Sequence, residues 1–286
     1  MNPILKYRGG KLRELDHYMK YIPSFNKYYE PFFGGGATYF NLEPSNARIG
    51  DINASLVRFY QDFVNNFDRV KLELHDLQLE YEQNRLQFLK NKKSDPNHHV
   101  IDPNDALYYR IRDMFNKKID SPFSYATLYF FINKTAYSGM IRYNKSGEFN
   151  VPYGRYANFN TDLLTVNHYN LLSTAEIENE SYENSFEEAG SGDFIYLDPP
   201  YDTTFSDYGN EEFTGDFNED SHRKLAQDFK NLEAPALMII SKTRLTSELY
   251  SGYIKDAYEK KYSVNIRNRF KSQAEHLVIT NYRVSH

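Results

Sequence analysis

The sequence predicts a mixed α/β protein built on a parallel sheet, with a helical and hairpin-containing segment inserted into it. Short apolar runs typical of buried strands alternate with helical patterns in the first and last parts of the chain. A glycine-rich turn joins one such run to the helix-like segment after it. Between the two parts, helical periodicity and then a basic hairpin pattern replace the alternation. We therefore expect residues 1–54 and 157–286 to form one domain and residues 55–156 a second, inserted one.

The clearest strand candidate is the run 194–197, which follows a Gly-Ser-Gly turn and stops at Asp198-Pro199-Pro200-Tyr201. Proline has no backbone N–H for a sheet ladder, so the two prolines end the strand on a stiff backbone. Asp198 and Tyr201 would then lie at the carboxyl end of a central strand, the edge where ligands bind in open α/β sheets. Taken alone, Asp-Pro-Pro is also compatible with an ordinary turn.

The segments after this strand continue the α/β pattern. We expect a long polar and aromatic loop at 201–218 and a helix that begins at Ser221. Further buried strands are expected at 236–241 and 277–282.

Composition limits the class of protein. A chain of 286 residues that is 40% hydrophobic can bury a substantial core. No run approaches the roughly 20 apolar residues of a membrane span, and the first residues do not resemble a signal peptide. The chain has no cysteine, so we expect a cytoplasmic setting and neither a thiolate nucleophile nor a cysteine-based metal site. The net charge of −5 disfavours indiscriminate polyanion binding but is compatible with a local basic face.

Two glycine-rich turns are candidate ligand loops. Residues 5–11 place two adjacent glycines among basic residues, ahead of a helical pattern. Residues 30–36 (E-P-F-F-G-G-G) pass from an aromatic run into three glycines and then a helix, as in a nucleotide-type cofactor pocket. The full G-x-G-x-x-G spacing is missing, which disfavours a pyrophosphate site. Asp51 ends the next strand candidate, where an acid can bind a ribose; an ordinary capping aspartate is the alternative.

The middle of the chain is predicted to be helical and then basic. Residues 55–120 have helical spacing and balanced charge, with Asp102 as a helix cap, and 125–132 is another apolar run. The stretch 133–156 holds four basic residues and one acid, with a hairpin turn at 144–147. Basic residues interleaved with tyrosines suit contacts with phosphates and bases. A surface hairpin without a ligand is the alternative.

In order, these segments resemble the Dam-type DNA adenine methyltransferases (D12 class, alpha group). Residues 6–11 (K-Y-R-G-G-K) are similar to the family's K-W-x-G-G-K, and residues 30–36 to its E-P-F-x-G-x-G. Residues 51–53 match D-I-N, residues 198–201 match D-P-P-Y, and 133–156 resembles the family's DNA-reading hairpin. The five motifs span nearly the whole chain. The resemblance implies a Rossmann-like S-adenosylmethionine-dependent methyltransferase sheet, with target recognition in the segment 55–156.

The resemblance implies S-adenosylmethionine as the cofactor. Asp51 would bind the ribose hydroxyls, the segment 32–36 would line the methionine portion, and Tyr7 and Lys11 would close the site. Tyr7 replaces the family's tryptophan and still offers an aromatic surface. The expected cofactor-binding set is Tyr7, Lys11, Glu30, Phe32, Phe33, Gly34, Gly36, Asp51 and Asp198.

The same resemblance makes Asp198, Pro199, Pro200 and Tyr201 the expected catalytic residues. The exocyclic amino group of adenine is a poor nucleophile because its lone pair is delocalised into the ring. The Asp198 carboxylate and the Pro199 carbonyl would accept its two N–H groups, and Tyr201 would stack on an adenine flipped out of the duplex. Much of the rate would come from orientation and electrostatic placement.

Double-stranded DNA is the expected partner, and GATC is the first choice of target. Lys6 and Arg142 would donate to guanine edges, Met140 and Pro152 would contact thymine methyl groups, and Tyr137 would press on a neighbouring base pair. Because Ser138 and Met140 stand where the family commonly has Asn and Leu, a related target sequence is also compatible. The expected DNA-binding set is Lys6, Arg8, Lys134, Tyr137, Ser138, Met140, Arg142, Asn144 and Pro152.

Other functions stay open at this point. A DNA cytosine N4-methyltransferase would more usually carry S-P-P-Y, and an enzyme acting on RNA or a protein amide would more usually carry Asn at position 198. A catalytically silent DNA-binding module could keep the same fold. A nucleotide-dependent oxidoreductase is disfavoured by the incomplete glycine fingerprint. A role in restriction–modification, mismatch repair, gene regulation or a mobile element is equally compatible with the sequence.

Overall fold

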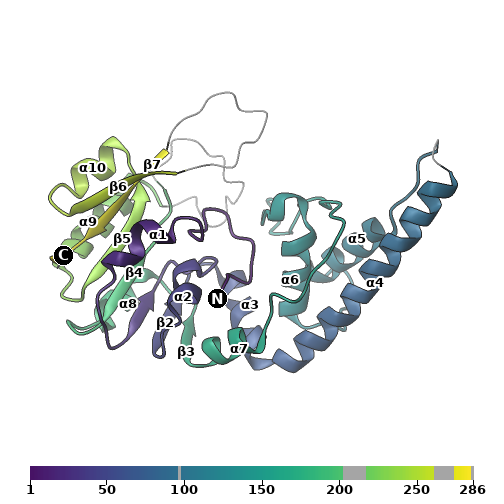
Figure 1. Ribbon diagram of the computed structural model, residues 1–286, viewed down its shortest axis with the longest axis horizontal. Helices are drawn as coiled ribbons and strands as arrows, with labels where there is room; N and C mark the ends of the chain where they lie inside the picture. The colour runs from purple at the N-terminus through teal and green to yellow at the C-terminus, as the bar shows by residue number, and fades with distance from the viewer. Residues whose placement is uncertain (96–97, 202–216, 261–273, 285–286) are drawn as a thin grey trace.

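A computed structural model describes residues 1–95, 98–201, 217–260 and 274–284, which form a seven-stranded sheet with helices on both faces (Figure 1). The strand order is β3-β2-β1-β4-β5-β7-β6. Neighbours from β3 to β5 are parallel, whereas β7 runs antiparallel to β5 and β6. The strands are β1 (Tyr28–Glu30), β2 (Ala47–Gly50), β3 (Ala175–Glu178), β4 (Phe194–Leu197), β5 (Ala236–Ser241), β6 (Ile254–Lys260) and β7 (Ala274–Thr280).

Helices connect these strands and form a separate group beside the sheet. Figure 1 shows α4, α5 and α6 extending away from the sheet, with α4 as their long outer member. The helices are α1 (Leu15–Tyr18), α2 (Ala37–Leu42), α3 (Ala54–Asn65), α4 (Phe67–Ser94), α5 (Pro103–Phe115), α6 (Tyr125–Thr135), α7 (Val166–Ser173), α8 (Tyr182–Glu188), α9 (Glu219–Asn231) and α10 (Arg244–Leu249), with the short 3-10 turns η1 (Met19–Tyr21) and η2 (Tyr137–Gly139). Among the described helices, none has the length and apolar character needed to cross a membrane.

The apolar core has two parts, one on each face of the sheet. Side chains alternate between faces along a strand, so Phe194 and Tyr196 of β4 enter one cluster while Ile195 and Leu197 enter the other. All four are buried, as expected for a central strand covered on both sides. The first cluster continues without a break from the sheet into α4, α5 and α6.

The strand order places three loops side by side at the carboxyl edge of the sheet. The chain runs outward from β1 to β2 and β3, then returns to place β4 on the other side of β1. Such a reversal opens a ligand site between the loops that follow the two central strands. The loop after β1 carries the glycine turn, the loop after β4 carries Asp198, and Asp51 directly follows β2.

Most predicted elements are present, with local differences. Asp102 caps α5 as predicted, because its side chain accepts a hydrogen bond from the N–H of Asn104. Helix α9 begins at Glu219 rather than Ser221, because the Asn218 side chain caps the N–H of Ser221. The predicted hairpin is reduced to two isolated antiparallel bridges, 136 to 153 and 143 to 149. The loop predicted at 201–218 lies largely outside the described residues, and the domain division at 55 and 156 stays a prediction.

Candidate active site

The glycine turn after β1 is shaped by two left-handed residues. Gly34 and Gly36 have φ values of 50° and 66°, a conformation that side chains disfavour. A Cβ atom on Gly36 would lie 2.5 Å from the buried ring of Phe33, and one on Gly34 would lie 2.7 Å from the ring of Tyr7. Phe32 points the other way and stacks on Tyr182 of α8, with ring centroids 5.7 Å apart. The turn is therefore a bare backbone surface between aromatic rings.

Asp51 holds this turn to the end of β2. Its carboxylate accepts hydrogen bonds from the backbone N–H groups of Gly34 and Asn53, both at 2.9 Å. Burial raises the pKa of Asp51, while these two hydrogen bonds oppose the shift. Asn53 in turn caps α3 through the N–H of Leu56. The predicted ribose-binding acid is thus fixed in place by the loop that it would serve.

Asp198, at the end of β4, forms an ion pair with Lys11 from the N-terminal loop. The Lys11 Nζ donates to both carboxylate oxygens, at 2.5 and 2.6 Å, and to the Tyr201 hydroxyl at 2.6 Å. Lys11 is 2% exposed, so this cation is almost fully removed from water. Burial raises the pKa of Asp198, whereas Lys11, His276 and Lys260 lower it. Three residues predicted for the site therefore meet through one ammonium group.

Glu30, the last residue of β1, lies beneath the same site. It is buried, and its Oε2 accepts a hydrogen bond from the Tyr28 hydroxyl at 2.6 Å. Burial raises the pKa of Glu30 to about 8; the charge of Asp198 adds to the shift, and the Tyr28 bond and Lys11 oppose it. A carboxyl with that pKa is mostly protonated at neutral pH, which avoids a second buried anion beside Asp198.

The N-terminal loop is also tied to α6. Backbone N–H and C=O of Lys6 form reciprocal bonds with the Asn133 side chain, at 2.9 and 2.8 Å. The Lys6 Nζ donates to the carbonyl of Lys134 and lies 4.2 Å from the ring centroid of Tyr156. The Lys134 Nζ turns back to the carbonyl of Ile4, and burial lowers its pKa to about 8. Both predicted DNA-binding lysines therefore hold the loop to α6, and of the two only Lys6 is exposed.

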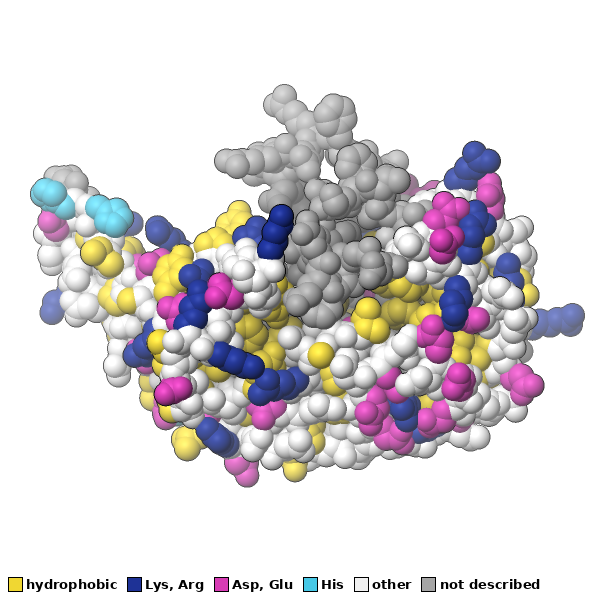
Figure 2. Space-filling model, turned by 180° about the vertical axis from the view of Figure 1, so that it is seen from behind, with side chains coloured by type: hydrophobic (Ala, Val, Ile, Leu, Met, Phe, Trp, Pro, Cys, Tyr) yellow, Lys and Arg dark blue, Asp and Glu magenta, His cyan; other side chains and the backbone are white. Residues whose placement is uncertain are grey.

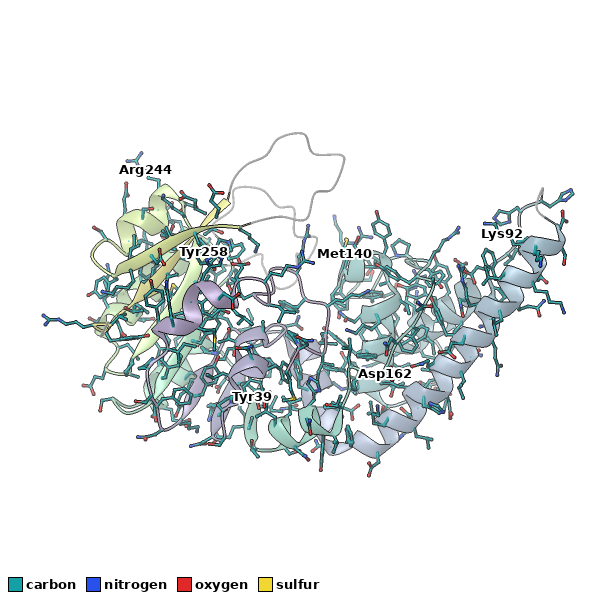
Figure 3. All side chains as sticks on the ribbon, viewed as in Figure 1. Tyr39, Lys92, Met140, Asp162, Arg244 and Tyr258 are labelled. Atoms are coloured by element: carbon teal, nitrogen blue, oxygen red, sulfur yellow. The ribbon has the colours of Figure 1, made fainter. Side chains whose placement is uncertain are left out.

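Arg8 is exposed in the N-terminal loop, and the segment 137–152 presents the remaining predicted DNA contacts. Tyr137 is 58% exposed, and Ser138 beside it is left-handed, with φ 57°. Met140 lies beside α6, on the side nearer the sheet (Figure 3). The Arg142 Nε donates to the Asn150 side chain at 2.8 Å, which orients the guanidinium, and Pro152 is exposed. Asn144 instead caps the turn by accepting from the N–H groups of Ser146 and Glu148.

Comparison with known proteins agrees with this geometry. A family model described as D12 class N6 adenine-specific DNA methyltransferase matches residues 7–266. The chain belongs to this family. It is 34% identical over 290 residues to the Type II methyltransferase M.CviBI of Paramecium bursaria Chlorella virus NC1A, covering 99% of this chain and 100% of the relative. Its identity to M.MjaIII of Methanocaldococcus jannaschii is 32% over 303 residues, covering 99% of each chain.

A DNA adenine methylase of Escherichia coli K12 is also similar, 31% identical over 254 residues that cover 86% of this chain and 83% of the relative. This D12 chain is accordingly an adenine-specific DNA methyltransferase, and the predicted family resemblance is confirmed. The family assignment removes the oxidoreductase and cytosine alternatives. Which residues carry each role stays a prediction.

The D12 structure contains further polar residues that sequence reasoning missed. Asn133 lies within the predicted hairpin motif, yet its part is to bind the N-terminal loop. Glu14 and His276 form a buried pair behind Tyr201, and Tyr258 joins them from the β6–β7 side of the sheet (Figure 3). An acid three residues after the K-Y-R-G-G-K motif was the one available signal. Nothing in the local sequence linked it to a histidine near the end of the chain.

Proposed function

We propose that this enzyme transfers a methyl group from S-adenosylmethionine to N6 of an adenine flipped out of a short duplex site, GATC or a related sequence. The observation that carries the proposal is the position of Asp198. Its carboxylate lies at the carboxyl end of β4, with Lys11 and Tyr201 in contact through one ammonium group. The glycine turn after β1 and the segment 137–152 complete a cofactor side and a DNA side.

The residues of the turn suit S-adenosylmethionine. Glycine is required at positions 34 and 36, because φ is positive at both and the rings of Tyr7 and Phe33 occupy the space that a Cβ would need, so the turn offers backbone groups rather than side chains to a ligand. The Asp51 carboxylate has accepting capacity beyond its two backbone bonds, which suits ribose hydroxyls. Tyr7, Lys11 and Glu30 would complete the pocket, with Phe33 packed behind Gly36 and Phe32 turned toward Tyr182 of α8. When bound there, S-adenosylmethionine supplies an electrophilic methyl group.

Asp198 would prepare the adenine amino group as an acceptor of that methyl group. An ionised carboxylate has about four acceptor positions, so bonding to Lys11 leaves room for an N–H of the base. The Pro199 carbonyl would accept the second N–H, which favours a pyramidal nitrogen with a localised lone pair. Lys11 favours the ionised carboxylate and fixes the Tyr201 hydroxyl, so that the ring is oriented for stacking on the base.

DNA would be held by the exposed residues of the N-terminal loop and the segment 137–152. The stretch 133–156 carries four basic residues and one acid on a chain whose net charge is −5, and Figure 2 shows basic and acidic side chains interspersed over one face of the molecule. A local excess of basic residues can neutralise phosphates while the acidic remainder limits indiscriminate binding. Tyr137, Met140, Pro152 and Arg142 would contact bases, with Lys6, Arg8 and Ser138 beside them. Lys134 and Asn144 would support this DNA-binding surface rather than contact DNA, because the Lys134 ammonium binds the Ile4 carbonyl and the Asn144 side chain caps the turn at 144–147.

The test is transfer of a labelled methyl group from S-adenosylmethionine to duplexes that contain GATC or single-base variants, followed by mapping of the modified base. A matched GATC duplex already methylated at N6 serves as the control. We expect label only on the unmethylated adenine. Absence of transfer to any adenine would overturn the proposal, and transfer at another sequence would overturn only the choice of target.

Arg142 tests the recognition part of the proposal. We expect Arg142→Ala to reduce discrimination at one guanine by about 1–3 kcal/mol, because a bidentate donor to O6 and N7 is lost. The measurement is the ratio of kcat/KM on cognate and single-substituted duplexes. An equal loss on every duplex would instead identify a phosphate contact.

A further inference from the structure

A buried carboxylate, Glu14, collects three hydrogen-bonding partners behind the active site. Its Oε2 accepts from the Nδ1 of His276 at 2.6 Å and from the Tyr258 hydroxyl at 2.8 Å. Its Oε1 lies 3.1 Å from the Nζ of Lys260. Tyr258 and Lys260 belong to β6 and His276 to β7. The Glu14 side chain therefore binds the N-terminal segment to both antiparallel strands.

This group touches both halves of the catalytic constellation. The backbone N–H of Glu14 donates to the carbonyl of Lys11 at 2.8 Å, so the acid and the lysine share one turn. On the other side, the His276 imidazole packs on the Tyr201 ring, with centroids 5.2 Å apart. The Lys260 Nζ lies 5.5 Å from the same ring centroid. Tyr201 is thereby backed by an imidazole whose own position is set by Glu14.

Burying the Glu14 carboxylate and the His276 imidazole costs desolvation free energy, which a purely structural contact would not require. Glu14 and His276 are 6% and 0% exposed, and the His276 Nε2 has no hydrogen-bond partner within the described part of the chain. Burial by itself would raise the pKa of Glu14, but the His276 hydrogen bond and the charges of Lys11, His276 and Lys260 lower it to about 2. An apolar pair of the same size would hold the sheet and loop together at least as well.

We propose that Glu14 and His276 are positioning residues of the methyl-transfer site, a role that rests on the proposed function of Tyr201 as the platform for the flipped adenine. Glu14 fixes the imidazole through its Nδ1–H, and the imidazole fixes the plane of the Tyr201 ring. Neither residue touches the base. Their contribution lies in the orientation of the adenine amino group toward Asp198.

The test is a double-mutant cycle on the single-turnover methylation rate with saturating S-adenosylmethionine and GATC duplex. We expect His276→Ala and Glu14→Met each to slow the wild-type enzyme about 10-fold, with the dissociation constants for cofactor and duplex changed less than about 2-fold. Glu14→Gln keeps an acceptor for the Nδ1–H and should recover most of the rate. In a Tyr201→Ala background, His276→Ala should cause less than about 2-fold further loss, because its effect passes through the missing ring.

A second readout does not depend on turnover. A duplex with 2-aminopurine at the target position reports the stacking of the flipped base by its fluorescence in the complex, and we expect His276→Ala and Glu14→Met to change that signal. Glu275→Gln is the matched control, because Glu275 adjoins His276 on β7 and its carboxylate forms an ion pair with Lys242 at the surface. If His276→Ala unfolds, Glu14→Gln and Glu14→Met, compared by thermal unfolding and fluorescence, carry the test.

The outcomes separate this inference from the proposed function. Losses that multiply in the Tyr201→Ala background, or variants as fast as wild type, would overturn the positioning role alone. A wild-type protein that methylates no adenine in any duplex would overturn the proposed function and this inference with it.

Discussion

The ion pair between Asp198 and Lys11 joins the proposed catalytic carboxylate to a buried cation. The Lys11 side chain is 2% exposed and that of Asp198 is 22% exposed, so the lysine has almost no contact with water and the carboxylate has little. Removing one member of such a pair leaves an uncompensated charge, typically at a cost of about 3–5 kcal/mol. Substitutions at position 198 therefore act on stability as well as on chemistry, and the two effects need different variants.

Asp198→Asn should separate these effects. The amide keeps an acceptor for Lys11 but loses the charge that orients the amino group, so we expect methylation to fall at least about 100-fold. DNA affinity should stay within about 3-fold, because Asp198 carries no proposed phosphate contact. Asp198→Ala should lose activity and also melt at a lower temperature, and adding Lys11→Met should restore the melting temperature. Equal melting temperatures for Asp198→Ala and wild type would contradict the buried pair.

Glu30 gives a pH dependence of stability. Its pKa in the folded state, about 8, lies above the ordinary value of 4.5. The protonated side chain therefore contributes fully to the free energy of unfolding below pH 4.5, and this contribution is lost as the pH rises toward 8. Glu30→Gln mimics the protonated form. We expect it to raise the free energy of unfolding by several kcal/mol more at pH 8.5 than at pH 5, since each pKa unit of the shift corresponds to about 1.4 kcal/mol. Urea unfolding at both pH values measures this, with exposed Glu178→Gln as the control.

At the scale of elements, the turn between β1 and α2 combines two glycines in different surroundings. Phe33, against Gly36, is buried, whereas Tyr7, against Gly34, is 40% exposed. We expect Gly36→Ala to lower both the melting temperature and the affinity for S-adenosylmethionine. Gly34→Ala should mainly weaken cofactor binding, because the Tyr7 ring can shift into the site.

Calorimetric titration and thermal unfolding distinguish these two glycine variants. Gly190→Ala is the control, since that residue has no positive φ and a Cβ there would meet its nearest neighbour at an ordinary 3.8 Å. Unchanged stability in Gly36→Ala would mean that the Phe33 ring yields, contrary to its buried packing.

For the whole molecule, the distribution of charge predicts the salt dependence of DNA binding. A basic segment on a chain of net charge −5 should contact few phosphates, so we expect log K to fall with log salt at a slope of about −3 to −4. Lys145→Gln removes an exposed cation of the turn at 144–147 and should reduce that slope by about 1, equally on cognate and unrelated duplexes. Lys242→Gln, on the sheet, should leave it unchanged. A sequence-dependent effect of Lys145→Gln would contradict a phosphate contact.

The sequence by itself determined the elements with a strong local signal. Phe194–Leu197 is apolar at every position and ends at two prolines, which fixes a buried central strand and its boundary. The glycine turn, Asp51 after its strand and the order of the motifs likewise sufficed for the α/β class and the family. Local signals failed at the hairpin, where side-chain caps from Asn144 replace a regular ladder.

Only the tertiary structure decided what surrounds Asp198 and Tyr201. Lys11 reaches Asp198 across 187 residues of chain, and His276 reaches Glu14 across 262. Such contacts depend on the strand order, which returns β4 to the side of β1 and places β7 between β5 and β6. Periodicity reports which face of an element is buried, but it carries no information about which distant element covers that face. The role of Lys134 and the pairing of Glu14 with His276 therefore emerge only when the sheet is assembled.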